Sequence, residues 1–406
     1  MTLQFDIRQL VHSLSDTLDL VGLDEVHHGK RVAFMAWNCA GNMQLNDEQL
    51  DRVYHASLLH DCGVSSSEVH RNLVNEFDWS ESQEHCIKGE ALLNRCRLFQ
   101  KLSLIIRYHH THWQDLPDSL EYEDALISNL IYLTDRVDAL IFQQQESDIL
   151  MVRDKIFDII QRYRGSYFNT ELVDVFLDVA ENEFFWLTLE PRHLTRYLTV
   201  MEQQKTSQAA GMDTVLEISN MFADIVDAKS SFTFEHSKGV SRLSKFIGEL
   251  LQLPTETLNM LEVAGLLHDL GKLNIPDEIL EKPGPLTKNE RAVMLRHSFE
   301  SYQILSRITG FEEIAEWAAF HHEEIAGSGY PFRKKQNSLS IEARIIAVAD
   351  VFQALAQNRP YRDSLPPEEI VTIMNEMTFN GKLDTYLTEL IKENFDKCFQ
   401  HAQCIE

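Results

Sequence analysis

LEVAGLLHDLGK, residues 261–272, is the stretch that decides the fold of the second half of this chain. Its apolar residues predict a buried helix that ends at the adjacent pair His268 and Asp269. Neighbouring side chains on a helix diverge by about 100°. The pair can therefore serve one site only if that site is broad, with Asp269 bridging two metal ions and His268 binding one of them. The stretch predicts a helical bundle whose inward-facing side chains hold a dinuclear metal centre.

The same pair recurs in the first half as His60 and Asp61, in the sequence HDCGV. An ordered set of seven histidines and aspartates surrounds each pair. The second set is His236, His268, Asp269, His297, His321, His322 and Asp350. The first set is His28, His60, Asp61, His85, His109, His110 and Asp135. One histidine at helical spacing is more often a core residue than a ligand, but that reading does not account for seven residues repeated in order. The chain is predicted to contain two related metal-binding domains in tandem.

Composition favours an all-α protein made of two such domains. The chain has 406 residues, of which only 16 are glycine and 10 are proline. Long stretches place apolar residues three and four apart, as at Val240, Leu243 and Ile247, whereas alternating strand patterns are nearly absent. We expect a first domain over residues 1–180, a connecting helix and joint over 181–212, and a second domain over 213–406.

The net charge and the cysteines indicate which binding partners and which cellular compartment to expect. A formal net charge of -26 would repel a nucleic-acid backbone, which excludes a polymeric nucleic acid as substrate but leaves a small phosphate ester. The six cysteines stand at irregular intervals without a Cys-x-x-Cys pair, as reduced thiols do. No signal peptide is recognisable, and no apolar run reaches the roughly 18 residues that span a bilayer. We therefore expect a cytoplasmic protein without a membrane partner.

Residues 212–395 resemble an HD-GYP domain, a branch of the HD metal-dependent phosphohydrolase superfamily, and the first half resembles a divergent HD domain. The likeness of the second half extends over a whole domain. It is carried by His236, HDLGK (268–272), KPGPLT (282–287), His297, HHE (321–323), GSGYP (327–331), ARIIAVAD (343–350) and RPYR (359–362).

The resemblance implies a phosphodiesterase that opens a cyclic dinucleotide, cyclic di-GMP or cyclic GMP-AMP, to the linear 5'-phosphorylated dinucleotide. It implies two divalent metal ions in the second domain, and the mixed imidazole and carboxylate ligands suit iron or manganese. One ion would be bound by His236, His268, Asp269 and Asp350. The other would be bound by Asp269, His297, His321 and His322.

Four further residues are candidates for contact with substrate. Lys272 lies one helical turn after His268, where its charge could stabilise a phosphate oxygen beside the catalytic Asp269, although a solvated lysine at a helix end would look the same. Arg359 and Arg362 are spaced to share one helical face and could clamp the other phosphate. Tyr330 lies in the GYP loop, where its ring either packs near a base or is simply an exposed turn residue.

Several positions depart from the family pattern. Ser230, Ser301, Ala326 and Gln353 replace residues that are usually Asp, Gly, Asp and Asp, and none of the four is an expected metal ligand. Phe232 stands where some members carry a glutamate for a third metal, so we expect a dinuclear site. The departures leave open an alternative function, a catalytically weak effector that binds a cyclic dinucleotide and signals through a partner. A homodimer or a partner protein at the GYP loop is also left open.

The first half keeps the seven ligand positions but few groups that would hold a cyclic dinucleotide. Val64 replaces the lysine, Gln144 and Ser147 replace the two arginines, and THWQDLPDS (111–119) has no GYP. Two more metal ions could bind here, with Asp24 as either an extra ligand or a surface residue. The domain would then act as a 5'-nucleotidase on the linear product, or it would serve regulation or dimerisation. Ring opening is expected only in the second half.

Overall fold

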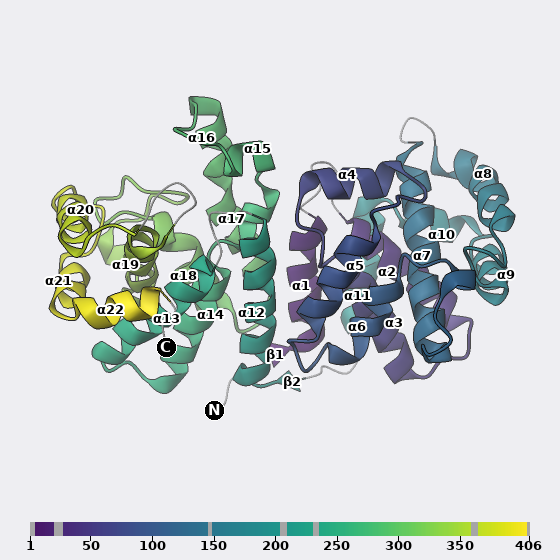
Figure 1. Ribbon diagram of the computed structural model, residues 1–406, viewed down its shortest axis with the longest axis horizontal. Helices are drawn as coiled ribbons and strands as arrows, with labels where there is room; N and C mark the ends of the chain where they lie inside the picture. The colour runs from purple at the N-terminus through teal and green to yellow at the C-terminus, as the bar shows by residue number, and fades with distance from the viewer. Residues whose placement is uncertain are drawn as a thin grey trace. The chain divides into compact units, whose positions relative to one another are not determined.

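The structure is a computed structural model that describes residues 5–19, 27–144, 148–203, 209–229, 235–358 and 364–403. The candidates Arg359 and Arg362 lie outside these ranges, as do Asp24, Ser147, Ser230 and Phe232. The described chain is helical apart from one isolated bridge and a short antiparallel pair, β1 (Phe5–Asp6) and β2 (Ala209–Ala210) (Figure 1). The predicted all-α fold is confirmed. None of the described helices is both long and apolar enough to cross a membrane.

The chain divides into two compact units, and each unit holds one of the two ligand sets. Leu18–Ser207 form the first unit, and Met1–Thr17 together with Gln208–Glu406 form the second. This division does not follow the expected boundaries at either end. The first 17 residues group with the second unit, and residues 181–207 group with the first.

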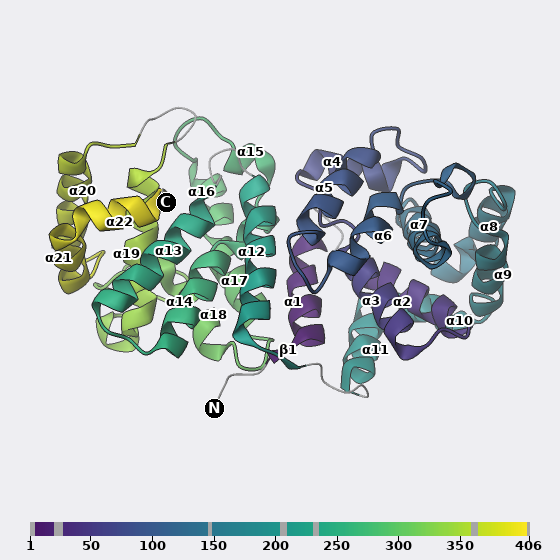
Figure 2. The same cartoon turned by 60° about the horizontal axis from the view of Figure 1, so that its bottom comes forward.

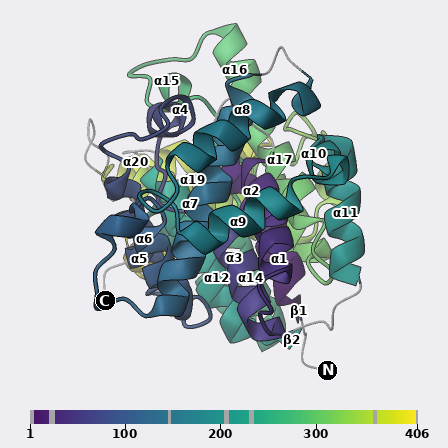
Figure 3. The same ribbon diagram turned by 90° about the vertical axis from the view of Figure 1, so that its right-hand side faces the viewer.

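The first unit is built around the long helix α7 (Tyr122–Phe142), most of whose side chains are buried. The helices α2 (His28–Gly41) and α3 (Asp47–Leu59) pack on each other and on α7, and α8 (Ile149–Arg162) and α9 (Thr170–Val179) pack on α7 as well (Figure 3). The remaining helices of this unit are α4 (Ser67–Asn75), α5 (Gln83–Leu93), η1 (Gln100–Leu102), α6 (Ser103–Tyr108), η2 (Trp113–Asp115), α10 (Glu183–Thr188) and α11 (Pro191–Gln203).

The segment expected as a connector is part of the first unit's core. Trp186 in α10 is fully buried, and its indole N–H donates to the carbonyl of Ala180 at 2.7 Å. Leu194 and Leu198 in α11 are also buried. Burial of these apolar side chains explains why residues 183–203 group with this unit.

The second unit repeats this plan around α19 (Ile341–Ala356), whose apolar residues are buried along most of its length. The helices α12 (Met212–Ala228), α13 (His236–Leu250) and α14 (Thr255–Leu267) lie side by side (Figure 2). The other helices are α1 (Ile7–Asp19, which crosses the division), η3 (Leu270–Asn274), α15 (Asp277–Leu280), α16 (Lys288–Met294), α17 (Arg296–Leu305), α18 (Glu312–Ala319), η4 (Phe320–His322), η5 (Gln336–Ser338), α20 (Pro367–Phe379), α21 (Thr385–Glu393) and α22 (Phe395–Ala402).

A glycine after each His-Asp pair lets the backbone pass close to the next ligand helix. A Cβ atom on Gly271 would lie 2.1 Å from the carbonyl oxygen of His297, and one on Gly63 would lie 2.0 Å from that of His85. Real side chains do not tolerate such distances. The two units therefore place the His-Asp pair against the third histidine of the set by the same close backbone contact.

Candidate metal centres

The seven predicted ligands of the second unit lie in or directly beside six elements and converge on one place. His236 is the first residue of α13, His268 follows α14, and Asp269 precedes η3. His297 lies in α17, and the remaining ligands lie in η4 and α19. Because these side chains project inward from different helices, tertiary packing alone brings them together.

Asp269 lies at the centre of the cluster, and its two oxygens face two different groups of imidazoles. Oδ2 is 3.5 Å from Nε2 of His236 and 3.2 Å from Nε2 of His268. Oδ1 is 3.6 Å from Nε2 of His297 and 3.8 Å from Nε2 of His321. Asp350 completes the first group, with Oδ1 3.3 Å from Nε2 of His236. This is the arrangement that a carboxylate between two metal positions requires.

The Nδ1 atoms of four histidines are held by hydrogen bonds that leave Nε2 facing the cluster. His268, His297 and His321 each donate Nδ1–H to the backbone carbonyl three residues earlier, at 2.8, 2.7 and 2.6 Å. His236 instead donates to the side-chain oxygen of Gln353 at 2.5 Å. Such contacts fix the tautomer and orientation of a metal-binding imidazole.

Two buried atoms of this cluster have no hydrogen-bond partner, namely Oδ1 of Asp269 and Nε2 of His268. Leaving such atoms unpaired costs free energy, so their position indicates a ligand. Three sets of side chains have their ligand atoms within 4.8 Å of one another: His236, His268 and Asp350; His268, Asp269 and His321; and His297, His321 and His322. The residues fit metal ions.

The protonation states also suit cations. Burial lowers the pKa of His297 to about 4 and that of His322 to about 3, so both are neutral at pH 7. Burial would raise the pKa of Asp269, but His268 and Lys272 hold it well below its usual range. Burial lowers the pKa of His236, whereas hydrogen bonds to Asp269 and Asp350 raise it to about 10. Metal binding at His236 therefore displaces a proton.

Lys272 and Tyr330 both lie at the cluster. Nζ of Lys272 donates to Oδ2 of Asp269 at 2.5 Å, and the side chain is 19% exposed. The Tyr330 ring packs on His322, with centroids 4.7 Å apart, and lies 6.3 Å from the ring of His297. The structure thus brings two of the four predicted substrate contacts to the ligands.

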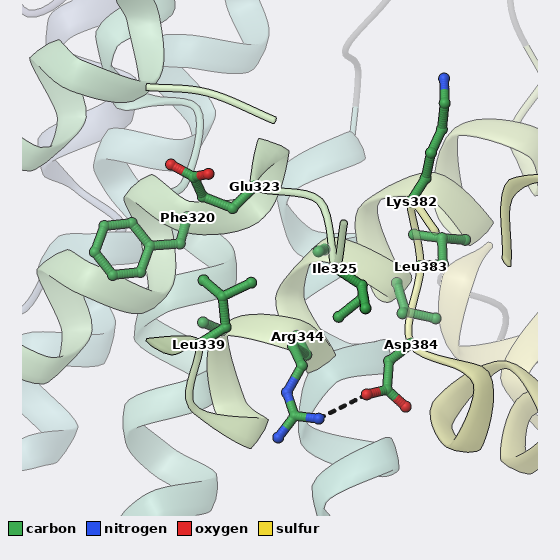
Figure 4. A pocket seen from close by; sticks show the side chains of 11 residues that line it. Phe320, Glu323, Ile325, Leu339, Arg344, Lys382, Leu383 and Asp384 are labelled. Atoms are coloured by element: carbon green, nitrogen blue, oxygen red, sulfur yellow. Dashed lines mark hydrogen bonds and ion pairs between the residues drawn. The ribbon is translucent and has the colours of Figure 1, made fainter. Parts of the chain in front are cut away.

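Glu323 belongs to the HHE run, but no role was predicted for its side chain. Its carboxylate is buried and accepts hydrogen bonds from the backbone N–H groups of Phe332, at 2.6 Å, and Lys334, at 2.8 Å. Figure 4 shows Glu323 at the edge of a small pocket that the Arg344–Asp384 ion pair closes on another side. Glu323 therefore fixes the chain that follows Tyr330. The HHE run pointed to it, but its partners follow from the folded loop.

Ser301, one of the departures from the family pattern, has a structural role. Its hydroxyl accepts from the backbone N–H of Gly271 at 2.9 Å and donates to the carbonyl of His268 at 3.0 Å. The side chain is fully buried. Ser301 thus ties the His-Asp segment to α17 where the first unit has Gly89 in close contact with Gly63.

The first unit brings its seven predicted ligands together in the same way. Oδ2 of Asp61 is 3.6 Å from Nε2 of His28 and 3.4 Å from Nε2 of His60, and Oδ1 is 3.5 Å from Nε2 of His85. Asp135 lies 3.4 Å from Nε2 of His28. His109 and His110 join Asp61 and His85 in a set of ligand atoms within 4.8 Å. Oδ1 of Asp61 is buried without a hydrogen-bond partner. This cluster also fits metal ions.

Two arginines mark the first unit's cluster, and the sequence reasoning missed both. The buried Arg136 donates to Oδ2 of Asp135 at 2.8 Å and to the carbonyl of Glu76 at 2.8 Å. Arg31 forms an ion pair with Asp138 at 2.6 Å, and Asp138 accepts from Nδ1 of His28 at 2.7 Å. Both guanidinium groups are thus engaged by carboxylates beside the ligands.

Known proteins resemble the chain over its whole length. A family model described as an HD domain matches residues 220–387. The 3'3'-cGAMP-specific phosphodiesterase 1 of Vibrio cholerae is 35% identical over 401 residues, which cover 97% of this chain and 93% of that protein. The 3'3'-cGAMP-specific phosphodiesterase 3 of the same organism is 26% identical over 426 residues, covering 92% and 91%. A cyclic di-GMP phosphodiesterase of Thermotoga maritima is 33% identical over 59% of this chain and 58% of its own length.

A solved structure shares the fold. The crystal structure of a cyclic GMP-AMP specific phosphodiesterase of V. cholerae matches 100% of this chain and 99% of its own, with a TM-score of 0.65 and 23% identity. The two ligand clusters, the GYP loop and the likeness to the first relative along nearly the whole chain all indicate the same family. The chain belongs to the HD-GYP family of HD-domain phosphohydrolases.

Proposed function

We propose that the second unit hydrolyses a 3'3'-cyclic dinucleotide to the linear 5'-phosphorylated dinucleotide, with cyclic GMP-AMP as the preferred substrate and cyclic di-GMP as the second choice. The names of the two relatives that match nearly the whole chain support this order. The observation that carries the proposal is Asp269, whose two oxygens face two separate groups of imidazoles.

The seven ligands of the second unit would hold two divalent ions. Iron or manganese suits the mixed imidazole and carboxylate set. Two such ions supply Lewis acidity at a phosphate oxygen and lower the pKa of a bound water. Asp269 would contact both ions, and Gln353 orients His236 toward one of them.

Lys272 and Tyr330 would position the substrate. The ammonium of Lys272 already neutralises charge on Asp269 and lies where a phosphate oxygen would gain a charge-assisted hydrogen bond. Tyr330 packs on His322 and offers the rest of its ring to a base. Arg359 and Arg362, which lie outside the described residues, would bind the second phosphate.

Product analysis on the full-length protein tests the assignment. With Mn²⁺ or Fe²⁺ present, the wild-type chain should convert cyclic GMP-AMP to the linear dinucleotide, and Asp269→Ala should abolish this conversion. The matched variant Asp61→Ala removes the corresponding carboxylate of the first unit and should leave ring opening largely intact. Unchanged turnover in Asp269→Ala would refute the proposal. Tight binding without turnover by the metal-loaded wild type would instead support the effector function.

A second candidate activity belongs to the first unit. Its ligand cluster repeats the geometry of the second, but Val64 is buried at the position of Lys272. Such a site suits a small phosphate ester, and we propose 5'-nucleotidase activity on the linear product. Release of inorganic phosphate from the 5'-phosphorylated dinucleotide should then be lost in Asp61→Ala and retained in Asp269→Ala.

A further inference from the structure

His70 is a buried histidine beside the first unit's ligand cluster that the repeated ligand pattern leaves out. It is 6% exposed, and its ring lies edge-on to the ring of His28, with centroids 6.1 Å apart. Burial, with a smaller contribution from His28, lowers the pKa of His70 to about 4, so the ring is neutral at pH 7. Across the part of the chain that the structure describes, the His70 ring makes no hydrogen bond. Its N–H is therefore available to a ligand held at the cluster.

The helix that carries His70 is specific to the first unit. The side chain of Ser66 caps α4 at the backbone N–H of Val69, and the buried face of α4 contains Ser67, His70 and Leu73 at three-residue spacing. In the second unit the helix after η3 is α15, which has four residues and no buried side chain. The longer helix thus fixes His70 at the cluster.

His70 approaches the same half of the cluster that Lys272 approaches in the second unit. Lys272 contacts Oδ2 of Asp269, the oxygen that faces His236 and His268. His70 lies against His28, which together with His60 faces Oδ2 of Asp61. The first unit thus has a histidine in α4, His70, where the second unit has a lysine in η3, Lys272.

The two arginines beside this cluster already have partners, Arg31 in its ion pair with Asp138 and Arg136 in several hydrogen bonds. The guanidinium of Arg136 donates to Asp135 and to the carbonyls of Glu76 and Phe77. His70, in contrast, meets the cluster through its ring and makes no hydrogen bond to another described residue.

We propose that His70 donates a hydrogen bond to a phosphate oxygen of a phosphomonoester, or of inorganic phosphate, held at the first unit's cluster, which is the role proposed above for Lys272 in the second unit. The inference rests on the proposed binding of metal and phosphate by the first unit. An imidazole N–H suits one terminal phosphate group, whereas the second unit offers the ammonium of Lys272 and the Tyr330 ring to a diester. His70 would therefore help to set the substrate class of the first site.

Calorimetric titration with inorganic phosphate tests the proposal on the full-length chain. The parent is Asp269→Ala loaded with Mn²⁺, in which phosphate binding reports the first unit, and Asp61→Ala in this background gives the binding that does not depend on that cluster. In the parent, His70→Ala should raise the Kd for phosphate about tenfold, which corresponds to one charge-assisted hydrogen bond. His70→Gln, which keeps an N–H donor, should recover most of the affinity. The control is His193→Ala in α11, an exposed histidine beside Glu190.

The bound Mn²⁺ is measured in the same samples and should not change in His70→Ala. Asp61-dependent phosphate binding that is insensitive to His70→Ala would overturn the inference while leaving the first unit's proposed site intact. Loss of Mn²⁺ in His70→Ala would overturn it in favour of a metal ligand. Absence of any Asp61-dependent phosphate binding would refute the proposed site of the first unit together with this inference, whereas cyclic dinucleotide hydrolysis by the wild type would be unaffected.

Discussion

Gln353 and Gly239 lie against each other in the second unit, at the positions where the first unit has an ion pair. In the first unit the corresponding residues are Asp138 and Arg31, which form an ion pair that also holds His28. In the second unit neutral Gln353 holds His236 and donates to the carbonyl of Ala402. A Cβ atom at Gly239 would lie 2.8 Å from Gln353 Cγ and 2.5 Å from that carbonyl oxygen. A buried ion pair has thus been exchanged for an amide and the space that it needs.

Substituting Gln353 by leucine should weaken metal binding in the second unit. Leucine has a similar volume but no acceptor, so Nδ1 of His236 would lose its partner and the ring its fixed orientation. Loss of such a supporting contact costs about 10- to 100-fold in metal affinity. Competition with a fluorescent chelator measures this in Gln353→Leu. Gln403→Leu, which removes the hydrogen bond to Ala356, is the control. Equal affinities in the two variants would contradict the role of Gln353.

Glu323→Ala should release the segment after Tyr330 without removing metal. Two backbone N–H groups would lose their acceptor, and Tyr330 would no longer be held against His322. We expect KM for the cyclic dinucleotide to rise about tenfold, with a smaller change in kcat, and Glu323→Gln to recover part of the loss. The neighbouring Glu324, whose carboxylate accepts from Ser328, supplies the control Glu324→Ala. A fall in kcat alone would point to a role in the chemical step instead.

The limit of sequence-based prediction is visible in these same residues. The predicted ligands converge in both units because their order and spacing are repeated, and repetition is a signal that sequence carries. Gln353, Arg136 and His70 carry no such signal. Gln353 meets His236 across 117 residues, and Arg136 meets the carbonyl of Glu76 across 60. Such partners are set by helix packing and not by local spacing.

The His-Asp-x-Gly segment acts as one element with the ligand helix beside it. Because a side chain at Gly271 would overlap the carbonyl of His297, Gly271→Ala should push η3 away from α17. We expect a loss of about 1–3 kcal/mol in the free energy of unfolding and release of metal from the second unit. Gly211→Ala is the control, since a Cβ atom there meets nothing within 4 Å. Differential scanning calorimetry with metal analysis measures both effects, and equal stability of the two variants would contradict this account.

Helical periodicity predicted that the elements are helices, but it did not predict which unit each helix belongs to. The apolar spacing of α13 and the capping residues of the other helices are local properties, and the all-α fold follows from them. We expected a connector over residues 181–212, which include α10 and α11, because the segment ends in the polar stretch MEQQKTSQAAGM, residues 201–212. Trp186 and Leu198, however, bury their side chains in the first unit. Periodicity reports that one face of a helix is buried, not which core buries it.

At the scale of the whole molecule, the internal repeat predicted two units but not the path of the chain between them. The first 17 residues belong to the second unit. There Phe5 meets the Phe311 ring edge-on, with centroids 5.2 Å apart, and Gln9 accepts from the backbone N–H of Thr309 at 3.0 Å. Asp16 forms an ion pair with Arg307 at 2.7 Å. These contacts join residues about 300 positions apart, so no local pattern could predict them.

Phe5→Ala should therefore destabilise the second unit, although residue 5 precedes the whole first unit in the chain. The Phe5 side chain is 1% exposed, and truncation of a buried phenylalanine costs about 3–5 kcal/mol. Phe184→Ala, which removes a ring that is 58% exposed in the first unit, is the control. In the full-length protein, cyclic dinucleotide hydrolysis should be lost at a lower temperature in Phe5→Ala, while Asp61-dependent phosphate binding should persist. If Phe5→Ala instead reduced phosphate binding and left the thermal inactivation of hydrolysis unchanged, residues 5–17 would stabilise the first unit. Because the second unit needs this segment, a fragment that begins at residue 208 should lack part of its own core.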